Sequence, residues 1–279
     1  MLISGTSFRA GGYVQSVADL ASMGRSILRS SLLSARTTRK WLKPISHTSS
    51  SSASVGRPWE ILRLKIPVAP APSPNSTTTT RLVDVYSKNG GLGNYLSLLG
   101  LSPDHDMGIA LLTGGPSAIQ AYTALQGFLT STWLQAGEHA AREQARINFA
   151  GTYTFPDNSS LNVTLLPNNP GLFLASLVSN GTDLFVSVGG TTGANSSSPG
   201  DFGGWLYPTK LAGGNRLAFR AVYGAVGQPA GDPCGSWSTV DGLRYGGNPA
   251  DLFIFETGAD GRATAVEVPV LKKKLRRVD

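Results

Sequence analysis

The sequence predicts an α+β protein in which an antiparallel sheet with packed helices is followed by a small antiparallel β-barrel or sandwich. In the first part, apolar residues recur at helical spacing in some segments and at strand spacing in others. From Gly151 onward, short apolar segments alternate with turn residues. The 34 glycines and 17 prolines in 279 residues also indicate many turns. We therefore expect two domains, residues 1–149 and residues 150–279.

Two short helices are expected first. Ser16 is a favourable N-cap with Asp19 three residues later, and an apolar stripe continues to Leu28. A tight turn at Gly11 and Gly12 would precede this helix. A second helix is expected over residues 34–42, and we interpret the apolar stripe of the first helix as core.

Strands are expected next. Residues 55–66 predict a strand, because apolar residues alternate with Arg63 and Lys65, and a loop rich in Pro, Ser and Thr follows over residues 68–80. Turn residues then separate three further apolar segments. These predict antiparallel strands at Leu82–Lys88, Tyr95–Leu101 and Met107–Thr113.

A long helix is expected after Pro116, with Gly137 as a kink or an end and a more polar continuation to Asn148. The second domain should then consist of short strands joined by turns. The expected strands are Gly151–Phe155, Leu161–Leu165, Leu172–Val178, Asp183–Val188, Trp205–Tyr207, Arg216–Tyr223, Ser236–Val240, Leu252–Glu256 and Ala263–Val268.

Bulk charge and hydropathy limit the classes of function. The net charge is +7, but five of the basic residues lie between positions 272 and 277, which leaves +2 for the remainder. We interpret this run as a basic tail, and we expect no nucleic-acid partner, because such binding needs a clustered patch. No segment has the length and hydropathy of a membrane span or a signal peptide. His105 lies in a Pro-Asp-His-Asp turn without a convincing second ligand, so we expect no metal and no cofactor.

The cysteine count and the sequons bear on the cellular compartment. Cys234 is the only cysteine, so it either pairs with a cysteine outside this chain or is a buried thiol. Matches to Asn-x-Ser/Thr favour a secreted, glycosylated parent protein. The candidate glycosylation sites are Asn75, Asn158, Asn162, Asn180 and Asn195.

The stretch around Lys88 carries the most chemical information. Lys88 ends an expected strand, and Gly90 and Gly91 follow it. A cation at the margin of a sheet can hold an anionic group, and glycines let a ligand lie against the backbone. Asn94 and Tyr95 come just after the turn and are weaker candidates for the same cleft. The simpler interpretation is an exposed lysine beside an ordinary turn.

This segment resembles the third motif, Lys-Thr/Ser-Gly, of the penicillin-recognising serine hydrolases, and it is most similar to that of fungal secreted β-lactamase-like proteins. Further passages carry the resemblance in the same order along nearly the whole chain. They are Arg9-Ala-Gly-Gly, Ser16-Val-Ala-Asp-Leu, Trp41-Leu-Lys-Pro, His47-Thr-Ser-Ser, Val55-Gly-Arg-Pro-Trp-Glu-Ile and Ala150-Gly-Thr-Tyr. The resemblance implies a β-lactamase/transpeptidase-like sheet, present in part, followed by a β-rich C-terminal domain.

The resemblance also implies acyl transfer, in which a serine attacks an amide or ester carbonyl and water later releases the acyl group. It assigns Lys88 as the electrostatic group and Gly91 as the oxyanion donor. Asn89 stands where the family has Thr or Ser, which disfavours penicillin-type substrates. The implied substrate is a small-molecule or peptide-like acyl compound, and the implied substrate-binding residues are Asn89, Gly90, Asn94 and Tyr95.

Two further family motifs, Ser-x-x-Lys and Tyr-x-Asn, do not occur in the sequence. We therefore expect a chain that is inactive as given and that begins after the catalytic serine of a secreted parent. Its missing N-terminal segment would then be a partner. Two alternatives stay open: a pseudoenzyme or binding remnant, and an acyltransferase or esterase of secondary metabolism with the same fold.

Overall fold

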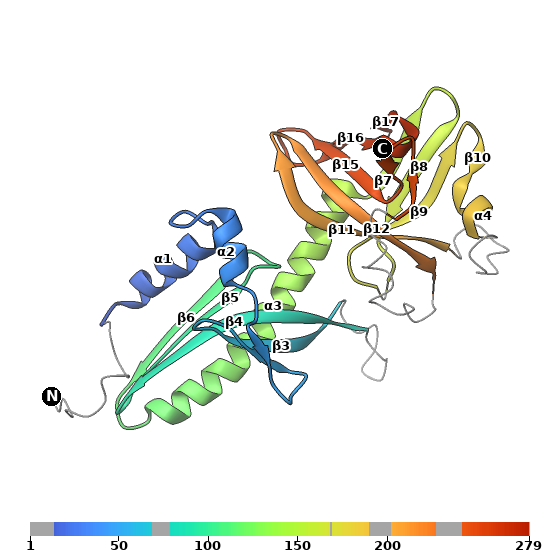
Figure 1. Cartoon of the computed structure of the whole chain (residues 1–279). Coiled ribbons are helices and arrows are strands. Elements are labelled where there is room, and N and C mark those ends of the chain that lie inside the picture. Colours follow the sequence, from blue (N-terminus) through green and yellow to red (C-terminus); the bar gives the residue numbers. More distant parts are fainter. Residues whose placement is uncertain (1–13, 69–78, 168, 190–201, 227–241, 279) are drawn as a thin grey trace. The chain divides into compact units, whose positions relative to one another are not determined.

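The structure, a computed structural model, describes residues 14–68, 79–167, 169–189, 202–226 and 242–278 (Figure 1). The chain divides into two compact units, Met1–Ala141 and Arg142–Asp279. Unit 1 contains a sheet with packed helices, and unit 2 consists mainly of strands. The predicted α+β class is therefore confirmed. Within the described residues, no helix has the length and hydropathy needed to cross a bilayer.

Unit 1 is built on a six-stranded antiparallel sheet in which the strands follow one another in chain order. One face packs against helix α1 through Leu20 and Ile27, and the other face packs against helix α3 through Leu134. The elements are α1 (Val17–Leu28), α2 (Ala35–Trp41), β1 (Ser46–His47), β2 (Ala53–Val55), β3 (Glu60–Pro67), β4 (Thr80–Leu92), β5 (Tyr95–Ser102), β6 (Met107–Gly114) and α3 (Ala118–Phe149).

The start of α1 follows from local hydrogen bonding. The Asp19 N–H donates to Ser16 Oγ at 3.2 Å, and the Ser16 N–H donates to Asp19 Oδ2 at 3.1 Å. This reciprocal capping box satisfies backbone donors that a helix leaves free at its N-terminus. Ser34 caps α2 in a similar way, by accepting from the Thr37 N–H. The predicted N-termini of both helices are confirmed.

The strand expected over residues 55–66 is two strands. A turn separates β2 from β3, and in it the Gly56 N–H donates to the Trp59 carbonyl at 2.7 Å. Trp59 is buried and its ring lies 5.1 Å from that of Trp41. The sequence reading missed this turn because Val55 and Ile61 look like parts of one alternating pattern.

Helix α3 runs without a break through Gly137, where we expected a kink or an end. The reason for this glycine is packing: a Cβ atom built there would lie 2.9 Å from Met107 Sδ and 3.3 Å from the His105 ring. Any larger residue would push the helix away from the turn between β5 and β6. Gly137 therefore lets α3 lie close to the turn between β5 and β6, and it does not mark a bend in the helix.

A buried polar network joins β4, β5 and α3. Arg81 Nε donates to Glu138 Oε2 at 2.8 Å, and His105 Nε2 lies 2.9 Å from the same oxygen. Ser102 Oγ lies 2.8 Å from His105 Nδ1. Burial opposes ionisation of Glu138, but its hydrogen bonds to His105 and Arg81 and their charges outweigh this effect, so the pKa of the carboxyl is lowered.

Unit 2 contains an eight-stranded antiparallel barrel, in which every strand pairs with the next and β9 pairs with both β8 and β11. The barrel closes because β17, its last strand, pairs with β7, its first (Figure 1). The elements are β7 (Gly151–Phe155), β8 (Ser159–Thr164), β9 (Leu172–Ser179), β10 (Thr182–Asp183), α4 (Leu184–Gly189), β11 (Phe202–Gly213), β12 (Arg216–Ala225), β13 (Arg244–Tyr245), β14 (Asn248–Pro249), β15 (Leu252–Thr257), β16 (Ala263–Val268), η1 (Pro269–Leu271) and β17 (Lys273–Arg277).

Aromatic rings fill the middle of the barrel. Phe255 is fully buried, and its ring centroid lies 5.3 to 5.8 Å from those of Phe149, Tyr153 and Phe219 in edge-to-face geometry. Phe149 is the last residue of α3, so this helix end is part of the barrel core. Edge-to-face pairs add about 1 kcal/mol each beyond the burial of their area.

Two predictions for unit 2 were wrong. Asp183–Val188 is not a strand, because Asp183 Oδ1 accepts the Phe185 and Val186 N–H groups and starts helix α4. The basic run read as a tail is strand β17, with Leu275 fully buried. The turn expected at Gly11 and Gly12, the residue Cys234 and the strand expected at Ser236–Val240 lie outside the described residues, as does most of the loop at 68–80.

The charged side chains of β17 explain why the sequence predicts a basic tail at this position. Lys273 pairs with Asp157 at 2.6 Å, and Lys274 pairs with Glu256 at 2.6 Å. Because partners elsewhere in the barrel neutralise these side chains, a strand with one core residue is stable at this position. The sequence gives no sign of these partners, which are distant along the chain.

Glu138→Gln should loosen unit 1 locally. The charged hydrogen bonds in this buried network are worth about 2 kcal/mol. Because the folded-state pKa of Glu138 is lowered, this contribution should be complete above the unfolded pKa and disappear as the pH falls through the folded value. We expect faster hydrogen exchange in peptides from β4 and β5 at pH 7, with a smaller difference in acid. Unchanged exchange in those peptides at pH 7 would contradict the network's role, and barrel peptides serve as the internal control.

Leu275→Ala should open the barrel. Removal of a fully buried leucine side chain costs about 2–5 kcal/mol. Hydrogen exchange should rise in peptides from β7, β16 and β17, and the thermal midpoint of the barrel should fall. The matched variant Lys274→Ala removes an adjacent, half-exposed side chain and should have a much smaller effect. Equal effects of the two variants would show that β17 does not belong to the core.

Candidate functional site at the margin of β4

Lys88 does not end its strand as the sequence predicts. Strand β4 continues through Gly90 and Gly91 to Leu92, and these residues pair with β5 in regular antiparallel register. The reversal of direction comes later, at Gly93, whose φ of +55° is a left-handed conformation that favours glycine. The glycines at 90 and 91 are therefore strand residues and not turn residues.

The lysine nevertheless lies at a margin of the sheet. Strand β3 begins at Glu60, which is in register with Ser87, so the pairing of β3 with β4 ends there. Among the described strands, only β5 pairs with the part of β4 from Lys88 to Leu92. One edge of the Lys88–Leu92 backbone thus has no strand partner in the described part of the chain, which is the geometry in which a sheet can receive an extended ligand.

Lys88 belongs to a chain of polar contacts that includes Glu60, Asn89 and Tyr122. Its Nζ forms a short ion pair with Glu60 Oε1 and also donates to the Asn89 carbonyl at 3.0 Å. Asn89 Nδ2 donates to Glu60 Oε2 at 2.6 Å, and the Tyr122 hydroxyl donates to Asn89 Oδ1. Glu60 therefore neutralises Lys88 and at the same time orients the amide of Asn89.

Tyr122 acts as a hydrogen-bond donor at this site. Burial raises the pKa of its hydroxyl, and the nearby Glu60 carboxylate raises it further, because both disfavour a tyrosinate. A tyrosine that serves as a proton acceptor needs the opposite shift. Tyr122 is therefore suited to fixing the Asn89 side chain and not to deprotonating a nucleophile.

The glycines pack tightly against β5. A Cβ atom on Gly90 would lie 2.5 Å from Ser97 Oγ, and one on Gly91 would lie 3.2 Å from Leu96 Cδ2. Both positions thus favour glycine for cross-strand packing, whether or not a ligand binds. This packing is a structural reason for the motif that the sequence alone did not reveal.

Asn94 and Tyr95 lie at the end of the β4–β5 hairpin and are exposed. Tyr95 pairs with Leu92, whereas Lys88 pairs with Leu99. A separation of four strand residues corresponds to roughly 13 Å. The structure therefore brings Lys88 and Asn89 together but leaves Asn94 and Tyr95 at the far end of the hairpin.

Glu60 and Tyr122 were missed as site residues by sequence reasoning. Tyr122 fits the apolar stripe of α3, and Glu60 lies at the start of a strand, so each has an ordinary interpretation. Only the register between β3 and β4 places Glu60 beside Lys88. No local pattern in the sequence encodes that register.

Ser102, His105 and Glu138 are arranged like a serine–histidine–acid triad. However, Ser102 is fully buried, and the His105 side chain is 1% exposed, so substrate has no access to them. Their hydrogen bonds stabilise the predicted turn at His105, which is confirmed. In the described part of the chain, no three His, Cys, Asp or Glu residues are grouped so as to hold a metal ion.

The candidate glycosylation sites differ in accessibility. Asn158 and Asn180 lie in turns with positive φ, whereas Asn162 lies in β8 and its Nδ2 donates to Thr152 Oγ1 at 3.1 Å. Asn158 is thus the best acceptor of the three, because the Asn180 side chain also accepts from Lys273 at 2.8 Å, and glycosylation stays a prediction at all three. Asn75 and Asn195 lie outside the described residues.

Comparison with known proteins defines the class of this chain. Residues 141–279 match the family described as "Beta-lactamase-like-like, C-terminal domain". The whole chain is similar to a beta-lactamase-like protein of the fungus Arthroderma benhamiae, with 31% identity over 94% of this chain and 48% of that protein. The C-terminal part of the chain therefore carries this family's domain, and the chain is similar to fungal beta-lactamase-like proteins over most of its length.

Two further relatives point to the same class. A beta-lactamase-like protein of Strobilurus tenacellus is 27% identical over 89% of this chain and 77% of its own length. A probable hydrolase of a Phoma species is 27% identical over 81% of this chain and 39% of its own length. The chain thus spans about half or less of the length of the Arthroderma and Phoma proteins.

The pKa of Tyr122 can be measured in protein labelled with ¹³C at the tyrosine ζ carbon, with Tyr122→Phe to assign the signal. We expect Tyr122 to ionise above the ordinary range for tyrosine. Glu60→Gln should lower this pKa, because it removes a negative charge that opposes tyrosinate formation. Glu143→Gln, an exposed change elsewhere on α3, is the control and should leave it unchanged. Ionisation of Tyr122 below the ordinary range would contradict its role as a donor.

Proposed function

We propose that the chain contributes the lysine-bearing wall of an acyl-transfer site in a β-lactamase-like serine hydrolase, which cleaves an amide or ester through an acyl-serine. The single observation that supports this most is the position of Lys88 and Asn89 at the unpaired margin of β4. In this proposal Lys88 supplies positive potential. A backbone N–H at Gly91 donates to the developing oxyanion, and one such donor is worth about 3 kcal/mol.

The nucleophile should come from outside these 279 residues. The sequence contains no Ser-x-x-Lys, and the serine of the triad-like cluster, Ser102, is buried. Tyr122 is held in its protonated state by burial and by Glu60. We therefore propose that the chain alone performs no acyl transfer and that the reaction needs a serine and a base from another segment or chain.

The Lys88–Glu60 pair favours neutral acyl substrates over penicillin-type carboxylates. A substrate carboxylate would have to displace the Glu60 carboxylate from Lys88, whereas a neutral ester or amide would not. Asn89, whose side chain is already bonded to Glu60 and Tyr122, differs from the Thr or Ser of the family motif. This observation favours an esterase or acyltransferase reaction within the same fold.

A fluorophosphonate probe and a fluorescent penicillin should both fail to label the purified chain, because its sequence contains no Ser-x-x-Lys motif to supply an activated serine. Intact-mass measurement after incubation checks this. Stoichiometric labelling of a serine within the 279 residues would show that the nucleophile lies inside the chain. The expected result is no mass increase above that of the untreated chain.

Binding of a substrate analogue to the Lys88–Gly91 segment can be tested by amide NMR. Titration with N-acetyl-D-alanine methyl ester should shift the Lys88–Gly91 amides with millimolar affinity, and N-acetyl-D-alanyl-D-alanine should shift them less. Lys88→Met should abolish the shifts, while Lys65→Met, which removes an equal charge from the neighbouring strand β3, should not. The absence of shifts at these amides would leave the chain as a non-catalytic remnant.

A further inference from the structure

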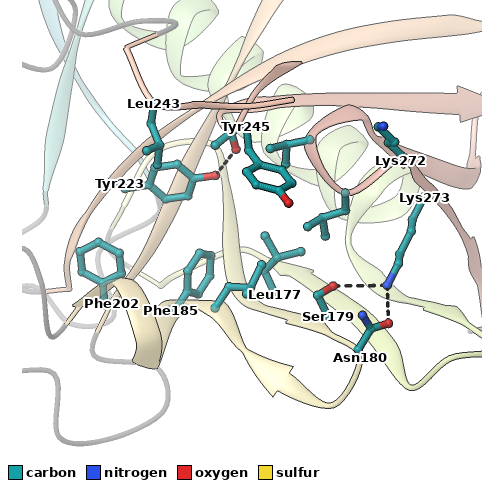
Figure 2. A pocket seen from close by; sticks show the side chains of 14 residues that line it. Leu177, Ser179, Asn180, Phe185, Phe202, Tyr223, Leu243, Tyr245, Lys272 and Lys273 are labelled. Atoms are coloured by element: carbon teal, nitrogen blue, oxygen red, sulfur yellow. Dashed lines mark hydrogen bonds between the residues drawn. The ribbon is translucent and has the colours of Figure 1, made fainter. Parts of the chain in front are cut away.

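The barrel of unit 2 has a cavity of about 410 Å³ at one end (Figure 2). It lies where β9 and β12 end and where β11 and β17 begin, and helix α4 and η1 border it. Its walls are mainly apolar, and none of its residues comes from unit 1. Apolar and aromatic residues of the wall include Leu177, Phe185, Phe202, Tyr223, Val270 and Leu271.

The size and position of this cavity fit a small ligand. Pockets for small molecules usually measure about 300 to 1,000 Å³ and occur at the mouths of β-barrels. An eight-stranded barrel is wide enough to hold one small ligand or to be filled by side chains. Here the buried rings of Phe253 and Phe255 occupy the interior, so the space for a ligand is confined to the mouth.

The aromatic wall offers contact area, and its buried hydroxyl is already bonded. The Tyr223 hydroxyl donates to the Ala250 carbonyl at 2.8 Å, and burial raises its pKa, so it stays protonated and bonded. At the rim, Leu243 is 62% exposed and Tyr245 is 76% exposed. A bound molecule would therefore cover apolar surface that is otherwise in contact with water.

One side of the cavity is polar and is organised by Lys273. Its ammonium group donates to Asn180 Oδ1 and Ser159 Oγ, both at 2.8 Å, and it lies 2.6 Å from Asp157 Oδ2 and 3.3 Å from Ser179 Oγ. Figure 2 shows Ser179 and Asn180 turned toward this lysine. The three ammonium protons are thus used within the protein.

This arrangement leaves hydrogen-bond donors for a ligand. Because Asn180 Oδ1 faces Lys273, the Asn180 Nδ2 group points elsewhere, and Ser179 keeps its hydroxyl proton after its oxygen has accepted a bond. Lys272 adds a positive charge at the same end. It is exposed, and within the described residues it has no ion-pair partner. Donors and a cation together favour an acceptor group with negative charge.

We propose that this cavity binds a small apolar carboxylate, with its hydrocarbon or aromatic part against Leu177, Phe185 and Leu271. The carboxylate lies at the polar side beside Ser179 and Asn180, and Lys272, which also lines the cavity, adds positive potential there. The site is independent of the proposed acyl-transfer wall, because every residue that lines it belongs to unit 2. Its occupation would stabilise the barrel without any effect on Lys88.

Displacement of 8-anilinonaphthalene-1-sulfonate by dodecanoate from the whole chain tests this proposal. We expect saturable displacement, together with methyl shifts of Leu177 and Leu271 in NMR spectra. Val270→Trp should fill the cavity and abolish both effects. Absence of displacement, or displacement that Val270→Trp does not reduce in a folded variant, would overturn the site.

The role of positive charge at the polar side of the cavity can be tested by removing the Lys272 ammonium group. Lys272→Met should weaken dodecanoate binding by about fivefold, which corresponds to an exposed ion pair of about 1 kcal/mol. It should leave binding of the neutral analogue dodecanol unchanged. Lys274→Met removes the same charge two positions along the chain, outside the cavity lining, and should have no effect on either ligand. If Val270→Trp does not fold, this pair of variants and the methyl shifts still decide, and equal effects of the two lysine variants would overturn the carboxylate assignment.

Discussion

Backbone hydrogen bonding at the edges of strands is the constraint on which both units depend. An unpaired strand edge leaves donors and acceptors that must find water, another strand or a ligand. Unit 2 meets this constraint by closing its sheet, with β17 between β16 and β7. Unit 1 keeps an open sheet in which β4 extends beyond β3, and the candidate site lies on that extension. The closed sheet of unit 2 thus has no free strand edge in its barrel, whereas the open sheet of unit 1 has one at the candidate site.

The charges at the unpaired margin of β4 limit which groups could bind beside Lys88. A lysine that serves a carboxylate substrate is most effective when no carboxylate of the protein already pairs with it. Here the Glu60 carboxylate pairs with Lys88 and accepts from the Asn89 amide, and the Tyr122 hydroxyl donates to Asn89 Oδ1. The similarity to beta-lactamase-like proteins suggests where a site could lie, whereas these contacts describe which side chains are already paired there. Both were needed for the proposal of an acyl-transfer site.

Local signals in the sequence predicted the elements that local forces determine. The capping box at Ser16, the strand Met107–Gly114 and the turn at His105 each depend on residues within a few positions of one another. The same holds for β7 and β16, which have the bounds that the sequence predicts. These elements needed no information about distant parts of the chain.

The errors have the opposite origin. Strand β17 has one core residue, and its lysines are neutralised by Asp157 and Glu256, which lie far away in sequence. The continuation of β4 past Lys88 depends on its pairing with β5, and Glu60 entered the site only through the register with β3. Pairing between strands that are distant in sequence therefore determined these features, which composition and periodicity did not predict.

Closure by β17 also affects how the barrel is made. Within unit 2, the ribosome synthesises β7 first and β17 last, yet the two strands are neighbours in the finished barrel. Until β17 emerges, β7 therefore has β8 on one side and no strand on the other. Such a nascent edge can recruit the wrong strand, including one from a second growing chain. The order of synthesis thus leaves the barrel open until its last strand is available.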